Sequence, residues 1–222
     1  MFAGPLQKAE SDCEIFESIG GLLLTAAAGG GINGMSKSLI DWNHAYQSGN
    51  WDGCDEGGQM SRYALLGGLI TLSGGTALLD VGCGRGLLRE FIRPGILHSY
   101  TGVDISQAAI DKVADRKPHE RFACARLEAW QPDQQYEVIV LNEVLYYLEN
   151  PYAALDKMHQ CLRPGGTIIL SIYRKTGWRS PNLNAEKQAR RYVAEKGLKL
   201  VEDIVFTSKT GGEKTWMILV IR

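Results

Sequence analysis

The sequence predicts an α/β fold built on a doubly wound sheet of seven strands, mostly parallel, with an antiparallel hairpin at the C-terminus. Residues 78–86 read Leu-Leu-Asp-Val-Gly-Cys-Gly-Arg-Gly, an apolar run that ends in an acid and a glycine-rich turn. Residues 87–92 then carry apolar side chains at helical spacing, which indicates a strand, a tight loop and a helix. Residues 137–142 are almost wholly apolar, as expected for a strand buried on both faces.

Composition excludes several classes of protein. The chain has 222 residues and a formal net charge of -1, so no global basic field points to nucleic acid. Its 45% hydrophobic and 22% charged residues are ordinary for a soluble globular protein. Five scattered cysteines without a Cys-x-x-Cys pair argue against a disulfide framework and against a zinc site. We therefore expect a cytoplasmic protein with no bound metal and no membrane partner.

The first third of the chain differs from the rest. Residues 1–34 are interpreted as a flexible N-terminal arm, because the apolar run 19–28 follows an acidic stretch, the wrong charge for a signal peptide, and is too short to span a bilayer. Residues 35–75 are expected to form a helical lid, with helices near 36–46 and 62–72. Residues 76–222 form the predicted core domain.

The core elements follow from apolar runs and stop signals. Pro94 and Pro118 end the first two helices, Ser106 is a good N-cap for the second of them, and Asn150-Pro151 begins the third. A charged helix over 184–196 closes at Gly197. The expected strands are 77–81, 99–104, 121–125, 137–142 and 167–173, with the terminal hairpin made by 199–208 and 214–221.

The glycine spacing narrows the class of ligand that the loop is expected to bind. Gly82, Gly84 and Gly86 give Gly-x-Gly-x-Gly, whereas a dinucleotide fingerprint needs glycine where Leu87 stands. The P-loop also fails, because no Gly-Lys-Ser/Thr follows. Asp104 ends the next strand, where a carboxylate can bond both hydroxyls of a ribose. An adenosine ligand without a diphosphate fits best.

Four blocks between residue 78 and about residue 173 resemble, in order, the class I S-adenosylmethionine-dependent methyltransferases, which have a Rossmann-like core. They are the glycine loop, Gly-Val-Asp-Ile-Ser, Tyr-Glu-Val-Ile-Val-Leu-Asn-Glu-Val-Leu-Tyr-Tyr-Leu and Leu-Arg-Pro-Gly-Gly-Thr-Ile-Ile-Leu-Ser. The third block is also similar to the group that includes the nodulation-factor N-methyltransferases. The resemblance implies S-adenosyl-L-methionine as the cofactor.

The resemblance also implies a set of cofactor-binding residues. Asp80 is expected near the methionine amino group, Asp104 at the ribose and Arg62 at the methionine carboxylate. At the end of the third strand the chain departs from the family pattern. An acid that accepts a hydrogen bond from the adenine amino group would therefore have to be Glu128. The other expected contacts are Gly82, Cys83, Gly84 and Asn142 through their backbone, and Ile105, Arg126 and Leu127 at the adenine.

The acceptor side is expected at Glu143, Tyr146 and Tyr147. Glu143 is a candidate general base or amine anchor, because an ammonium must lose a proton before it attacks; the alternative is a helix N-terminal acid favoured by the helix dipole. At least one of the two tyrosines is expected to pack in the core. Lid aromatics are expected to face the sulfonium or an amine, or else to attach the lid helix to the sheet. They are Trp42, Tyr46 and Trp51.

These observations predict a methyltransferase that acts on a nitrogen or oxygen of a small molecule. Only about ten residues separate the fifth strand from the last helix, too few for an inserted domain that would grip a macromolecule. Two alternatives stay open: a domain that binds the cofactor without turnover, and a nicotinamide-dependent reductase, which Leu87 disfavours.

Overall fold

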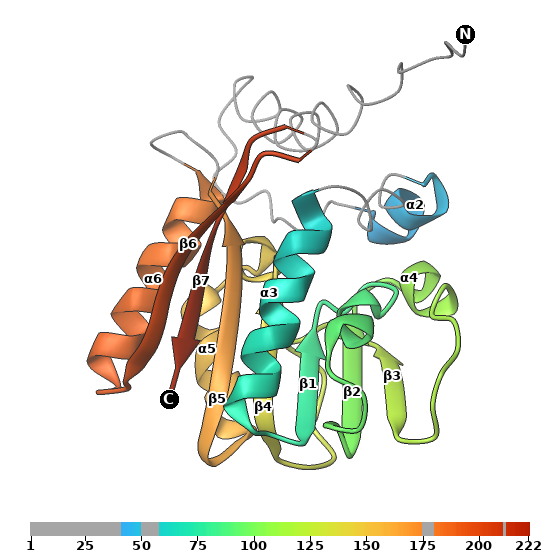
Figure 1. Cartoon of the computed structure of the whole chain (residues 1–222), viewed down its shortest axis with the longest axis horizontal. Helices are drawn as coiled ribbons and strands as arrows, with labels where there is room; N and C mark the ends of the chain where they lie inside the picture. The colour runs from blue at the N-terminus through green and yellow to red at the C-terminus, as the bar shows by residue number, and fades with distance from the viewer. Residues whose placement is uncertain (1–40, 50–57, 175–179, 211) are drawn as a thin grey trace, which may run out of the picture.

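A seven-stranded sheet in the order β3-β2-β1-β4-β5-β7-β6 forms the centre of the protein (Figure 1). The computed structural model describes residues 41–49, 58–174, 180–210 and 212–222. The expected seven strands and the antiparallel terminal hairpin are confirmed. The strands are β1 Ala77–Val81, β2 Ser99–Asp104, β3 Glu120–Cys124, β4 Tyr136–Asn142, β5 Leu162–Tyr173, β6 Leu200–Ser208 and β7 Lys214–Ile221.

Two hydrophobic layers enclose the sheet, because successive side chains of β4 point to opposite faces. Ile139 and Leu141 belong to the layer covered by α5 and α6, and Val138 and Val140 to the layer covered by α3 (Figure 1). All four side chains are fully buried. The helices are α2 Trp42–Gln47, α3 Gly58–Ser73, α4 Gln107–Asp111, α5 Pro151–Gln160 and α6 Pro181–Glu195, with 3-10 turns η3 Leu87–Phe91 and η4 Leu145–Tyr147.

The strand order reverses between β1 and β4. β1 pairs in parallel with β2 on one side and with β4 on the other, and β7 is antiparallel to both of its neighbours. Crossover connections leave β1 and β4 in opposite directions, so their carboxyl ends lie at the position where open α/β sheets bind ligands. Every cofactor residue predicted on β1, β2 and β4 therefore lies at this one edge.

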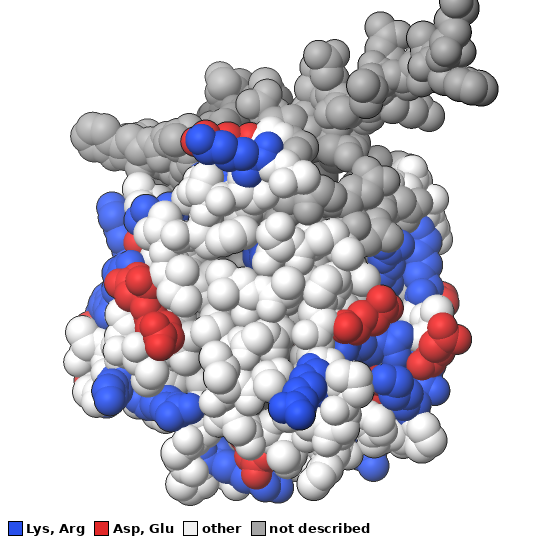
Figure 2. Space-filling view, in the orientation of Figure 1, with Lys and Arg blue, Asp and Glu red and all other residues white. Residues whose placement is uncertain are grey.

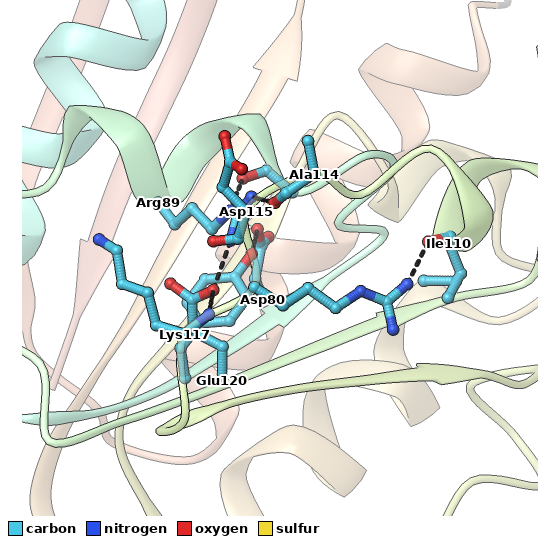
Figure 3. Close-up of polar contacts among 10 residues, drawn as sticks. Asp80, Arg89, Ile110, Ala114, Asp115, Lys117 and Glu120 are labelled. Carbon is cyan, nitrogen blue, oxygen red and sulfur yellow. Dashed lines mark hydrogen bonds and ion pairs between the residues drawn. The ribbon is translucent and has the colours of Figure 1, made fainter.

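The helix expected from residue 107 to before Pro118 is shorter than predicted. It starts where expected, since the Ser106 hydroxyl accepts the amide of Ala109 at 3.2 Å, but it ends at Asp111. Arginine side chains bind carbonyls in its last turn and beyond its end: Arg116 donates to Ile110 at 2.6 Å, and Arg89 to Ala114 and Asp115 (Figure 3).

Further boundaries differ from the prediction, and α3 and α6 start earlier than expected, at Gly58 and Pro181. The helix expected up to Pro94 is the single 3-10 turn η3, whose C-cap Ile92 is already extended. β5 starts at Leu162 rather than at Thr167, because Leu162 pairs with Tyr136 before the register shifts to Thr167 opposite Val138. The turn Arg163-Pro-Gly-Gly166 thus lies inside the strand.

The face that carries α3 has few charged side chains at its centre (Figure 2). Leu72, near the end of α3, is 83% exposed, and Val205 on the edge strand β6 is 56% exposed. Among the described residues, no helix has the length and apolar character needed to cross a membrane. The arm predicted over 1–34 lies outside the described residues, and the division into arm, lid and core stays a prediction.

Glu137 on β4 connects that strand to the residue that precedes β1. Its carboxylate accepts the amide and the hydroxyl of Thr76 at 2.6 and 2.9 Å, and Arg163 donates to its other oxygen at 2.8 Å. The hydrogen bonds from Thr76 lower the pKa of Glu137 to about 2. The folded chain therefore holds this carboxylate ionised under conditions where an unfolded chain protonates it.

We predict that Glu137→Gln removes a pH-dependent part of the stability. A lowered folded-state pKa contributes stability that is complete above the unfolded pKa of about 4.3 and is lost as pH falls towards about 2. The variant should have a lower urea midpoint than the wild type at pH 7, and the two midpoints should converge near pH 2. The exposed Glu202→Gln serves as the control. A wild-type midpoint that falls in parallel with that of Glu137→Gln would contradict this role.

Candidate active site

A glycine loop follows β1 and is held by the acid at the end of β2. Gly82 and Gly84 have φ angles of +71° and +55°, which favour glycine. The amide of Gly84 donates to Oδ2 of Asp104 at 2.8 Å, and the amide of Ser106 donates to Oδ1 at 2.9 Å. Burial raises the pKa of Asp104, and these two amides oppose the rise. The backbone amide of Ile105 also lowers this pKa, and a carboxylate, with about four acceptor sites, keeps capacity for a further hydrogen bond.

Asp80, the acid of β1, is buried with one of its two carboxylate oxygens lacking a hydrogen-bond partner. Its Oδ2 accepts the hydroxyl of Tyr100 at 2.6 Å, while its Oδ1 is buried without a partner. Burial raises the pKa of Asp80 to about 7. A buried acceptor without a donor costs about 1–3 kcal/mol, so a ligand with a positively charged N–H group would relieve a real penalty here.

Arg62 is the buried cation of the site. The guanidinium is 3% exposed and lies over the rings of Tyr63 and Trp216 at 4.7 and 5.6 Å. It donates to the side chains of Gln59, at 3.1 and 2.7 Å, and Asn142. Asn142, predicted to act through its backbone, thus also uses its side chain. The charge of Arg62 lowers the pKa of both Asp80 and Glu143.

Glu143 follows β4 in a strained conformation. Its φ is +61°, and the only other non-glycine residue with a positive φ in the described segments is Asp115. Its carboxylate accepts the hydroxyls of Ser171 and Tyr146, both at 2.9 Å. Burial raises the pKa of Glu143. The alternative of a helix N-terminal acid does not fit, because only the three-residue turn η4 follows.

The described part of the lid lies on the glycine loop and on α4. A Cβ on Gly84 would lie 2.7 Å from the hydroxyl of Tyr46. The side chain of Asn43 accepts the Ser106 hydroxyl at 3.0 Å and the Ala108 amide at 3.1 Å. Trp42 meets Tyr147 edge to face at 4.9 Å. α2 therefore contacts the glycine loop, the start of α4 and Tyr147 of η4.

The residues predicted at the adenine are brought together less fully than the other predicted cofactor residues. Ile105 is 40% exposed at the end of β2, as a residue that packs on a ligand would be. The side chain of Leu127 lies in the hydrophobic core instead, so a contact with adenine would have to come from its backbone. Arg126 and Glu128 are exposed and pair at 3.9 Å. The Cys83 side chain is buried, in keeping with a role through its backbone.

Several site residues were not predicted. Tyr100, Gln59 and Ser171 bond predicted residues, and Asn43 bonds Ser106, next to Asp104 and Ile105. The types and spacings of these four residues carry no signal that separates them from ordinary strand and helix residues. Tyr146 is 4% exposed, as expected if one tyrosine packs in the core. Trp51 lies outside the described residues.

Comparison with known proteins identifies the family. The model of a family described as a methyltransferase domain matches residues 59–203. The chain belongs to this methyltransferase family. The match covers the glycine loop, the strand-end acids and Glu143, and it confirms the resemblance to class I S-adenosylmethionine-dependent methyltransferases.

Curated relatives of this methyltransferase include malonyl-[acyl-carrier protein] O-methyltransferase 2 of Ilyobacter polytropus, 30% identical over 102 residues, 44% of this chain and 39% of the relative. Ubiquinone biosynthesis O-methyltransferase of Bradyrhizobium sp. is 32% identical over 111 residues, 48% of this chain and 43% of the relative. The matches thus span less than half of each relative.

Solved structures share the fold. N-methyltransferase NodS from Bradyrhizobium japonicum, in complex with S-adenosyl-L-homocysteine, superposes with a TM-score of 0.65 at 20% identity, over 81% of this chain and 97% of that chain. The plantazolicin methyltransferase BpumL, also in complex with S-adenosyl-L-homocysteine, gives a TM-score of 0.60 at 16% identity, over 94% of this chain and 99% of that chain. These likenesses confirm the Rossmann-like methyltransferase fold.

The described residues fit S-adenosyl-L-methionine, the cofactor of the family. The partnerless Oδ1 of Asp80 suits an ammonium group, and the remaining acceptor capacity of Asp104 suits ribose hydroxyls. The guanidinium of Arg62 suits a carboxylate. When bound, the cofactor supplies an electrophilic methyl group; the chain's own residues orient it and exclude water.

We predict that Gly84→Ala weakens cofactor binding at least tenfold. The new Cβ would meet the Tyr46 hydroxyl at 2.7 Å on the bare loop. Gly95→Ala is a matched control, because Gly95 also has a positive φ of +79° but nothing within 4 Å of a Cβ. Calorimetric titration with S-adenosylhomocysteine measures both. Equal affinities for the two variants would remove the loop from the site.

We also predict that cofactor affinity falls as the pH drops below about 7. Because burial raises the pKa of Asp80 to about 7, its carboxyl becomes neutral below that pH and no longer attracts an ammonium. The limiting slope is about tenfold per pH unit for one coupled proton. Calorimetry between pH 5.5 and 7 should show this slope in the wild type and a flat, weaker profile in Asp80→Asn. A flat wild-type profile would contradict the assignment.

Proposed function

We propose that this chain transfers the methyl group of S-adenosyl-L-methionine to a nitrogen or oxygen of a small-molecule acceptor. The observation that carries the proposal is the pair of buried acids around the glycine loop. Asp104 bonds the loop amide and Asp80 keeps one buried oxygen without a partner, at the edge where the strand order reverses. The pair lies within the region that matches the methyltransferase family.

The reaction requires placement rather than covalent help. Methyl transfer is an in-line displacement, so a fixed geometry and exclusion of water supply most of the acceleration. The chain offers residues for both tasks. Asp80, Asp104 and Arg62 stand at the donor side, and Glu143 and Tyr147 stand on the neighbouring turn, next to Val144, whose side chain lies 2.8 Å from where a Gly82 Cβ would be. We assign these last two residues to the acceptor side.

A small acceptor is supported by the short connection between β5 and α6. Tyr173 ends the strand and Pro181 begins the helix, which leaves no length for an added domain between them. Two relatives are named O-methyltransferases, of malonyl-[acyl-carrier protein] and of ubiquinone biosynthesis. A third is named trans-aconitate 2-methyltransferase, and NodS is named an N-methyltransferase. Both acceptor atoms are therefore within the range of chemistry that these similar proteins carry out.

We predict release of S-adenosylhomocysteine when the full chain is incubated with S-adenosylmethionine and a panel of amines, phenols and carboxylic acids. Asp104→Ala, which removes the acid at the ribose side, should abolish release. Binding of S-adenosylmethionine without release for any acceptor would favour a domain that only holds the cofactor. Binding of NADH in preference to S-adenosylmethionine would favour the reductase.

A further inference from the structure

We infer that the acceptor atom is the nitrogen of a cationic amine, and that Glu143 binds the ammonium and takes its proton before methyl transfer. This inference rests on the proposed function and adds the substrate class. Its starting point is the carboxylate of Glu143, which is bonded by the hydroxyls of Ser171 and Tyr146. Among the described residues, no cationic side chain forms an ion pair with it.

Arg62, the cationic side chain whose charge acts on Glu143, donates its hydrogen bonds to other residues. Arg62 influences Glu143 through its charge, but its guanidinium donates to the neutral side chains of Gln59 and Asn142. The same guanidinium is also the cation that faces Asp80. One positive charge thus serves two carboxyls, that of the buried Asp80 and that of the half-buried Glu143. A carboxylate that is shielded from water and lacks its own cation is costly, and a bound ammonium would supply the missing charge.

The backbone of Glu143 supports a functional role. A non-glycine residue in the left-handed region costs on the order of 1–3 kcal/mol, and such strain gathers at functional sites. A turn that only had to connect β4 to η4 would be better served by glycine. Here the amide of Glu143 donates to the carbonyl of Ser171 at 3.0 Å, which fixes the carboxylate beside the hydroxyl of the same residue.

A series of ring contacts leads from Glu143 to α2, starting at Tyr146, whose hydroxyl bonds the carboxylate. The rings of Tyr146 and Tyr147 lie 4.5 Å apart, and the indole of Trp42 meets Tyr147 at 4.9 Å. Aromatic faces attract ammonium groups, whereas a carboxylic acid acceptor would bring a second anion towards Glu143. The combination of one carboxylate and three rings therefore selects an amine over an acidic oxygen nucleophile.

The proposed step balances without a further reactant. The ammonium gives one proton to the Glu143 carboxylate, which leaves a neutral amine with a free lone pair. That lone pair forms the new N–C bond while the S–C bond breaks, and the electron pair of the broken bond stays on sulfur. The product is a methylated ammonium and a thioether. Glu143 then returns its proton to water.

The test compares acceptors that share a phenyl group and differ in the nucleophilic group, with benzylamine against benzyl alcohol and phenethylamine against phenylacetic acid. S-Adenosylhomocysteine release is measured for the wild type, Glu143→Gln and the exposed control Glu202→Gln. We expect release with amines alone, a loss of at least 100-fold in kcat for Glu143→Gln, as for removal of a general base, and an unchanged control. Cofactor affinity of Glu143→Gln should equal that of the wild type in calorimetry.

Each other outcome has a defined meaning. Release with the alcohol or the acid but not with amines would overturn the amine inference and leave the proposed function standing. Full activity of Glu143→Gln on amines would overturn the role of Glu143. No release with any acceptor by a chain that binds the cofactor would overturn the proposed function, and the inference with it.

Discussion

The carboxylate of Asp104 is the constraint on which the site depends. It accepts the amide of Gly84 through one oxygen and the amide of Ser106 through the other, and so ties the glycine loop after β1 to the start of α4 after β2. The lid reaches the same point, because Asn43 bonds Ser106 and Ala108. One buried acid thus ties the loop to the helix start, and α2 is bonded to that same helix start.

The second constraint is electrostatic. Asp80, Asp104 and Glu143 gather at the carboxyl ends of β1, β2 and β4, and burial raises the pKa of each. Arg62 is the buried cation among them. A site with more buried acids than buried cations is poised for a positively charged ligand, and a sulfonium donor with an ammonium group has that character. On the acceptor side, the carboxylate of Glu143 likewise favours a positively charged acceptor.

Much of this arrangement could be predicted from the sequence, because its signals are local. The run before Asp80, the glycine spacing and the Ser106 cap each follow from neighbouring residues, and parallel strands then bring their ends together. Other features depend on distant partners. α4 ends early because Arg89 and Arg116 bind carbonyls that a longer helix would have used, and no local pattern announces those bonds.

On the acceptor side, too, local sequence predicts only part of the arrangement. Glu143 was identified as a candidate from its residue type and place after β4, but its left-handed backbone and its bond to Ser171 on β5 come from tertiary structure. Likewise, Leu127 occupies a position expected at the adenine, yet its side chain packs into the core. Local sequence indicates where a site lies; which side chains serve it is decided by the packing between elements.

The most direct measurement for this account is a crystal structure of the full chain grown with S-adenosylhomocysteine. The account predicts ribose hydroxyls within hydrogen-bonding distance of the Asp104 carboxylate and the ligand's amino group on the free oxygen of Asp80. Ligand density at another edge of the sheet, or an amino group placed away from Asp80, would contradict it.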